Sequence, residues 1–175
     1  MATGDREQNE VLSVLVVGTE AWAVDRAARQ LQHAGHRVVG CPLADDYGRD
    51  CATLDGTGCG LGDLDVVLVV RARPLDRVVR SEYGALCALR RNVPLVLAGA
   101  GGRHPFADFA ATTVDPDGDV VGACTLVGAS GPTEHPKAAL DELEVLVRGG
   151  SQAVDRRWAH HLADPVPMQR DRVAR

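Results

Sequence analysis

The chain has 175 residues, a formal net charge of −5 and a composition that is 45% hydrophobic and 25% charged. This length suits one domain with a sizeable core, and the chain is too apolar for a disordered protein. No apolar run approaches the roughly 20 residues needed to span a bilayer, and the negative charge gives no general attraction to nucleic acid or anionic lipid. We therefore expect neither a nucleic-acid partner nor a membrane.

The start of the chain and its cysteines bear on compartment and cofactors. The first ten residues are polar and lack an apolar signal segment, and the cysteines number five, an odd count, so we expect a cytoplasmic protein with reduced thiols. None of the cysteines has the paired spacing of a zinc or iron–sulfur site. We therefore expect no metal and no cofactor. The alternative is zinc ligation by Cys41, Cys51 and Cys59, which share one segment, together with His33 or His36.

The first elements in chain order are two strands that flank a helix. Residues 11–18 form a nearly continuous branched apolar run, which is typical of a strand buried on both faces. Apolar residues then recur at helical spacing from Val24 to Leu31, and Gly35 terminates that helix. Residues 36–41 are predicted to form a second, short strand.

The middle of the chain predicts two more strands. Residues 42–63 are rich in glycine and aspartate and lack clear periodicity, so we expect only a short helix near 45–53. Residues 64–70 form the third apolar run, and a helix is predicted from Pro74 to about Arg91. The fourth strand follows directly, over the residues 93–99.

The last part of the chain departs from this alternation. Residues 111–128 contain a DPDG turn between two apolar runs, which predicts a hairpin or a strand extended past the sheet edge. Helices are predicted over 135–150 and 151–165. The whole pattern indicates an α/β fold: a three-layer parallel sheet of about five strands, flavodoxin-like or Rossmann-like, with an extra C-terminal hairpin and two helices. We expect three segments along the chain: a flexible tail (1–10), a single α/β domain (11–150), and a C-terminal helix with a tail (151–175).

Candidate binding residues follow the ends of the predicted strands. In such sheets ligands bind beyond the carboxyl ends of the strands, where the strand order reverses. Glycine amides and arginine forks at that edge suit a phosphate or a carboxylate. The alternative is that the glutamate there pairs with one of the arginines and closes the crevice. The candidate residues are Thr19, Glu20, Arg71, Arg73, Gly101, Gly102 and Arg103.

Four segments of the first hundred residues, VLVVGTE, GHRVVGC, DVVLVVRARP and VPLVLAGA, resemble strands and loops of response-regulator receiver domains. The resemblance places the phosphoacceptor position on Val70 and the switch hydroxyl on Gly99, and neither residue can serve there. It also leaves Glu20 as the only acid of the metal-binding loop. The resemblance therefore implies a degenerate receiver that cannot be phosphorylated, a non-catalytic regulatory domain.

A second segment, SEYGALCALRRNVPLVLAG, is similar to part of the nucleoside deoxyribosyltransferases and related N-glycosidases. This resemblance implies that Glu82 is a nucleophile. Glu82 also lies within an apolar stripe, between Val78 and Leu86, where a carboxylate would be desolvated. The ordinary alternative is a glutamate at the edge of the stripe that reaches solvent or pairs with a nearby arginine.

Three functions remain open from the sequence, so whether the chain is an enzyme is undecided. The first is a regulatory or interaction domain that binds a protein partner or a small anionic ligand. The second is a nucleoside or nucleotide N-glycosidase that uses Glu82. The third is a structural protein that forms a homodimer through the helices after residue 133, with Trp158 and Leu162 as apolar anchors.

Overall fold

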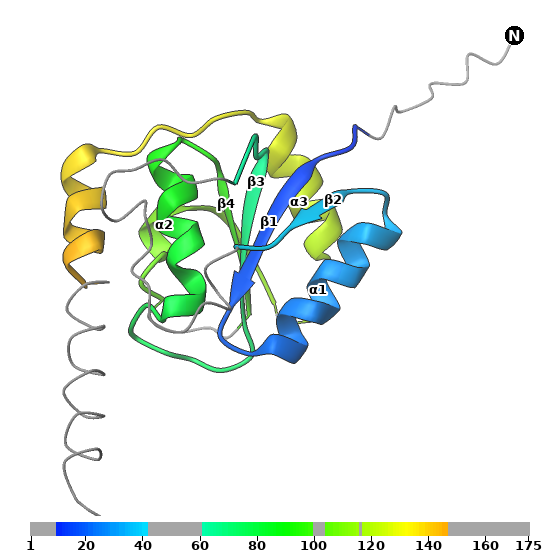
Figure 1. Ribbon diagram of the computed structural model, residues 1–175, viewed down its shortest axis with the longest axis horizontal. Coiled ribbons are helices and arrows are strands. Elements are labelled where there is room, and N and C mark those ends of the chain that lie inside the picture. Colours follow the sequence, from blue (N-terminus) through cyan, green and yellow to red (C-terminus); the bar gives the residue numbers. More distant parts are fainter. Residues whose placement is uncertain (1–9, 42–60, 100–103, 116, 147–175) are drawn as a thin grey trace, which may run out of the picture.

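A computed structural model describes residues 10–41, 61–99, 104–115 and 117–146. The described chain forms one five-stranded sheet with the order β2-β1-β3-β4-β5, in which every neighbouring pair is parallel (Figure 1). The predicted three-layer α/β fold is therefore confirmed. The strands are β1 (Ser13–Gly18), β2 (Arg37–Val39), β3 (Val66–Arg71), β4 (Leu95–Gly99) and β5 (Ala110–Val114).

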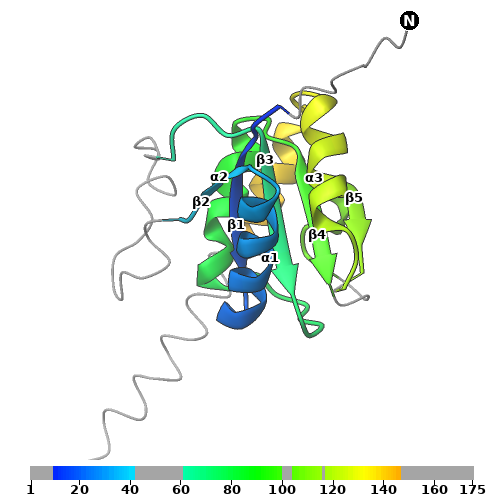
Figure 2. The ribbon, with the colours of Figure 1, turned by 90° about the vertical axis from the view of Figure 1, so that its right-hand side faces the viewer.

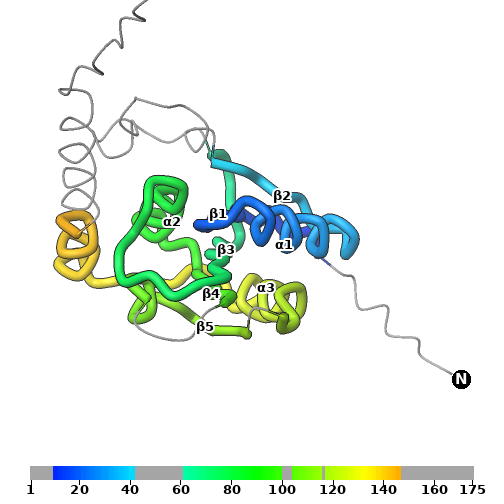
Figure 3. Tube along the Cα trace, turned by 90° about the horizontal axis from the view of Figure 1, so that it is seen from below, coloured from blue at the N-terminus to red at the C-terminus, as the bar shows by residue number. Residues whose placement is uncertain are grey.

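Helices cover both faces of the sheet (Figures 2 and 3). One face packs against α1 and α3, and the other packs against α2 and the helical residues 137–146. The central strands are apolar over most of their length because their side chains alternate between these two cores. The helices are α1 (Ala21–His33), α2 (Tyr83–Arg90) and α3 (Val120–Ala129), with short 3-10 turns η1 (Arg80–Glu82) and η2 (Ala107–Phe109).

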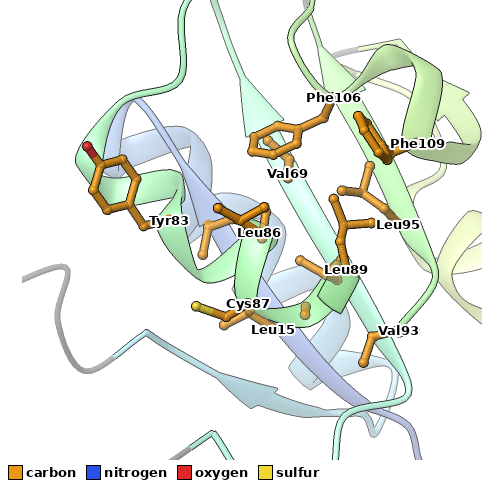
Figure 4. Close-up of a cluster of buried hydrophobic side chains, with 14 of the residues drawn as sticks. Leu15, Val69, Tyr83, Leu86, Cys87, Leu89, Val93, Leu95, Phe106 and Phe109 are labelled. Carbon is orange, nitrogen blue, oxygen red and sulfur yellow. The ribbon is translucent and has the colours of Figure 1, made fainter. Parts of the chain in front are cut away.

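The core on the α2 side is the larger of the two. Almost every residue of α2 is buried, because the helix lies between the sheet and later parts of the chain (Figure 4). Phe106, from the segment after β4, is completely buried against it, and Leu140 and Leu143 close the far side. The predicted helix over 135–150 is thus found at 137–146 within the described residues, with its apolar face used inside the domain.

The predicted hairpin over residues 111–128 is wrong. Its first half is β5, which pairs parallel to β4, and its second half is α3. The carboxylate of Asp119 accepts a hydrogen bond from the Gly122 N–H at 2.8 Å and caps this helix. The run is rich in β-branched residues, which favours a strand locally, but its buried positions recur at helical spacing. These buried residues are Val120, Cys124 and Val127.

The predicted helix from Pro74 to Arg91 begins later than expected. Only α2 and the preceding turn η1 are helical, and residues 72–79 form an irregular loop. The carbonyls of Leu75 and Arg77 accept hydrogen bonds from the Arg71 side chain, so the loop is held by a buried group instead of by helical bonds. Periodicity alone could not reveal this.

The remaining predictions concern the ends of the chain, the segment after β2 and the end of α1. The predicted short helix near 45–53, residues 1–9 of the predicted tail and the last helix over 151–165 lie outside the described residues. Gly35 ends α1 with φ +91°, as predicted for a glycine that terminates a helix. Within the part of the chain that the structure describes, no helix has the length and apolar character needed to cross a membrane.

Candidate functional site

A crevice of about 560 Å³ opens at the carboxyl ends of β1 and β3. The strand order reverses between these two neighbours, because β2 lies on one side of β1 and β3 on the other. The crevice is therefore in the predicted place. Its lining residues are Thr19, Glu20, Arg73, Pro74, Leu75, Val79, Arg80 and Ser81.

Glu20 bridges the two strand ends at the floor of the crevice. One carboxylate oxygen accepts a hydrogen bond from the Ala72 N–H at 3.1 Å, and the other accepts from Arg73 Nε at 3.0 Å. The Thr19 hydroxyl donates to the same carboxylate. Burial raises the pKa of Glu20, but these three donors outweigh that effect and hold the pKa below its usual range. Glu20 is therefore an ionised acceptor fixed in place.

Of the two arginines predicted to face Glu20, only Arg73 does so. Arg73 is 82% exposed and reaches over the crevice, whereas Glu20 is only 11% exposed. Arg71 pairs with Glu82 instead and is 1% exposed, so its predicted place in the crevice is wrong. Arg73 follows the end of β3 and lies in an irregular loop, so the regular alternation of side chains along a strand does not fix its direction.

Arg71 forms a completely buried ion pair with Glu82. Its Nε donates to one carboxylate oxygen at 2.6 Å and its Nη2 donates to the other at 2.6 Å. The Val79 N–H also donates to Glu82, at 3.1 Å. Neither side chain is exposed to solvent by more than 1%. This paired fork is the strong geometry for arginine and carboxylate.

The same guanidinium holds the loop that lines the crevice. Its Nη2 donates to the Arg77 carbonyl at 2.8 Å, and its Nη1 donates to the Leu75 carbonyl. Ser81 fixes the end of the loop, because its hydroxyl donates to the Gly18 carbonyl at 2.6 Å. Arg71 is therefore a positioning residue for the crevice, and not a group that a ligand would touch.

The predicted role of Glu82 as a nucleophile is wrong. The side chain is 0% exposed, and both of its oxygens are occupied by Arg71 and by a backbone amide. A nucleophile must approach its substrate, and this carboxylate faces a guanidinium instead. The sequence did indicate that Glu82 is desolvated, but it did not indicate the partner that neutralises it.

The receiver resemblance also does not hold at the site. A side chain at Gly99, the predicted switch position, would overlap the Arg71 carbonyl. Val70, the predicted phosphoacceptor position, is 7% exposed and packs in the core on the α1 side. The three other candidate residues, Gly101, Gly102 and Arg103, lie outside the described residues.

Metal ligation finds no support among residues 10–41, 61–99, 104–115 and 117–146. No group of three or more histidine, cysteine, aspartate or glutamate side chains is close enough there to hold an ion. Cys41 is buried, while Cys51 and Cys59, the other members of the alternative zinc set, lie outside the described residues.

His104 is a residue to which the sequence assigns no role. It lines a second cavity, of about 720 Å³, at the ends of β4 and β5. Its Nδ1 accepts a hydrogen bond from the Phe106 N–H at 3.1 Å. Burial, together with the charge of Arg71, lowers the pKa of His104 from 6.5 to about 4. The imidazole is therefore neutral at physiological pH.

This shift predicts a loss of stability on mild acidification. The unfolded chain takes up a proton at His104 below about pH 6.5, but the folded protein does not do so until about pH 4. The free energy of unfolding should therefore fall across that interval. In His104→Asn, whose side-chain oxygen can still accept from the Phe106 N–H, that part of the slope should disappear. Melting temperatures of both proteins at a series of pH values test this, and parallel curves would contradict it.

Comparisons with known proteins give distant matches among solved structures. No protein-family model matches the chain, and no curated protein matches it. The NanR protein of Vibrio vulnificus, complexed with ManNAc-6P, is 15% identical, with a TM-score of 0.40 and coverage of 88% of this chain and 58% of that chain. This chain thus spans less than two thirds of NanR. The sugar isomerase domain of the RpiR transcription factor from Sphaerobacter thermophilus is 21% identical, with a TM-score of 0.42 and coverage of 83% and 79%.

These similar structures give no support to the two family predictions. They are a NanR protein and a sugar isomerase domain, not receiver domains or nucleoside deoxyribosyltransferases. The burial of Glu82 and the lack of space at Gly99 are the observations that overturn the two predicted resemblances.

Proposed function

We propose that this chain is a non-catalytic regulatory domain that binds a small anionic ligand in the crevice between the ends of β1 and β3. The observation that carries the proposal is the position of Arg73. Its Nε is held by Glu20, so the guanidinium is oriented, yet the side chain is 82% exposed over the crevice. Its two Nη groups make no hydrogen bond to any described residue, so they are available to a phosphate or carboxylate.

The character of the remaining lining supports binding over catalysis. Among the described lining residues Glu20 is the one acid, and it is already saturated by three donors. Its lowered pKa makes it a weak base at neutral pH, so it is poorly suited to proton transfer. The hydroxyl of Ser81 is committed to the Gly18 carbonyl. These groups shape the crevice without offering a nucleophile.

A ligand screen by thermal shift tests the proposal. Inorganic phosphate, a sugar phosphate and a nucleoside monophosphate are the probes, and one that binds the folded state must raise the melting temperature. Arg73→Ala should weaken that ligand by about 10- to 100-fold, as expected for loss of a charged hydrogen bond. Arg37→Ala is the matched control, because Arg37 is an exposed arginine at the amino end of β2, whereas the crevice lies at the carboxyl ends of the strands. A ligand that binds Arg73→Ala as tightly as the parent would contradict the proposal.

The alternative of dimerisation through the helices after residue 133 remains a prediction. Within the described part of that region, Leu140 and Leu143 are buried inside the domain, while Val145 and Leu146 are 68% and 63% exposed. The proposed anchors Trp158 and Leu162 lie outside the described residues. Sedimentation equilibrium of the full chain would decide between monomer and dimer.

A further inference from the structure

A third cavity, of about 140 Å³, lies between α1 and α3 at the ends of β3 and β4. It shares no lining residue with the crevice. A cavity of about this size, lined by apolar side chains, accommodates one benzene-sized group. The apolar part of the lining consists of Ala23, Ala27, Val70, Ala72, Ala98 and Val120.

An exposed ion pair forms the polar rim of this cavity. Arg26 Nη2 lies 2.8 Å from Asp117 Oδ1, and the two side chains are 45% and 83% exposed. Gln30 completes the rim one helical turn beyond Arg26. Because both side chains are exposed to water, their ion pair contributes little free energy. A ligand group can therefore replace either partner at little energetic cost. The rim thus offers one positive and one negative charge side by side.

Trp22 stands at the mouth of the same cavity. It lines the cavity and is 60% exposed, in a chain in which only 3% of residues are aromatic. Trp22, Arg26 and Gln30 are spaced four residues apart, so they lie along one face of α1. A large aromatic ring beside an apolar cavity provides contact area for a bound apolar group.

We propose that this cavity binds a small apolar α-amino acid. The apolar side chain of the ligand enters the cavity beside Trp22. Its carboxylate accepts hydrogen bonds from Arg26, and its ammonium group donates to Asp117, so both charges of the rim pair remain compensated. An anion or a cation alone satisfies only one of the two. This site goes beyond the function proposed above, because it lies between α1 and α3, apart from the crevice, and takes a zwitterion.

The first experiment compares three ligands that share a phenyl group. Trp158→Phe leaves Trp22 as the single tryptophan, so its fluorescence reports on the cavity. L-Phenylalanine should shift this fluorescence with a dissociation constant of about 1 mM, as expected for a small ligand. 3-Phenylpropionate, which lacks the ammonium group, and phenethylamine, which lacks the carboxylate, should each bind about tenfold more weakly. If L-phenylalanine causes no shift, or if all three bind equally, the proposal is wrong.

The second experiment fills the cavity. Ala27→Leu, in the Trp158→Phe background, adds carbons inside the cavity and should abolish binding, while Ala21→Leu, an exposed position on the same helix, should not. Arg26→Ala changes an exposed residue, so this variant should fold and can test the proposal even if Ala27→Leu does not fold. It should weaken the binding of L-phenylalanine about tenfold. Unchanged binding in Arg26→Ala would overturn the proposal. Arg73→Ala should bind L-phenylalanine like the parent, so failure here is distinct from failure at the crevice.

Discussion

Glu82→Gln is expected to lower the free energy of unfolding by about 3–5 kcal/mol, which is a large part of the stability of an ordinary domain. The substitution keeps the shape of the side chain but leaves the Arg71 guanidinium buried with its charge uncompensated. Arg71 is 1% exposed, so water cannot replace the lost carboxylate. Urea denaturation of the parent and the variant measures the difference.

Two further variants separate this charge effect from other causes. Asp117→Asn breaks the exposed pair with Arg26 and should change the stability by about 0–1 kcal/mol. The double variant Arg71→Met/Glu82→Leu removes both buried charges and should recover most of the loss. It also removes the bonds to the Leu75 and Arg77 carbonyls, so the anion binding proposed for the crevice should be weakened even where stability returns. A loss below about 1 kcal/mol in Glu82→Gln would show that the pair is not the anchor that its burial indicates.

Gly99→Ala is expected to destabilise the protein by about 3 kcal/mol or more, through backbone strain and overlap together. Gly99 has φ +122°, which side-chain-bearing residues rarely adopt. A Cβ there would overlap the carbonyl oxygen of Arg71 and lie 2.7 Å from its carbonyl carbon. The clash is with backbone in the neighbouring strand, so it cannot be relieved by a rotamer change.

Gly131→Ala is the matched control for this prediction. Gly131 also has a positive φ, +76°, but no described atom lies within 4 Å of the place that a Cβ would occupy. It should therefore cost only about 1 kcal/mol, from strain alone. Thermal or urea unfolding of the two variants isolates the cost of the overlap. Equal losses would mean that β3 and β4 separate easily at their carboxyl ends.

The sheet could be predicted because its information is local. In β1 and β3, residues that alternate between two apolar cores read as nearly unbroken branched apolar runs, which are typical of a parallel sheet covered on both faces. The place of the crevice followed from the strand order, since Thr19, Glu20 and Arg73 come directly after strands that are neighbours. These three residues could be predicted to line the crevice without information about contacts between distant parts of the chain.

The second half of the 111–128 segment shows where local information fails. Its apolar, β-branched composition suits a strand or a buried helix equally, and the helical spacing of Val120, Cys124 and Val127 is only three positions long. The space beside α1 over β3 and β4 decided the outcome, because that face of the sheet needed a second helix to cover it.

The sequence by itself determined the α/β layers, the four apolar strands up to residue 99 and the edge of the sheet where the crevice lies, because periodicity and residue type carry those features. Only the tertiary structure decided which charges meet. Both arginines follow β3, yet Arg73 reaches Glu20 in the crevice while Arg71 is buried with Glu82. Desolvation makes an unpaired buried charge costly, so a buried Glu82 required a partner of opposite charge. The path of the loop between β3 and α2 determined that this partner is Arg71.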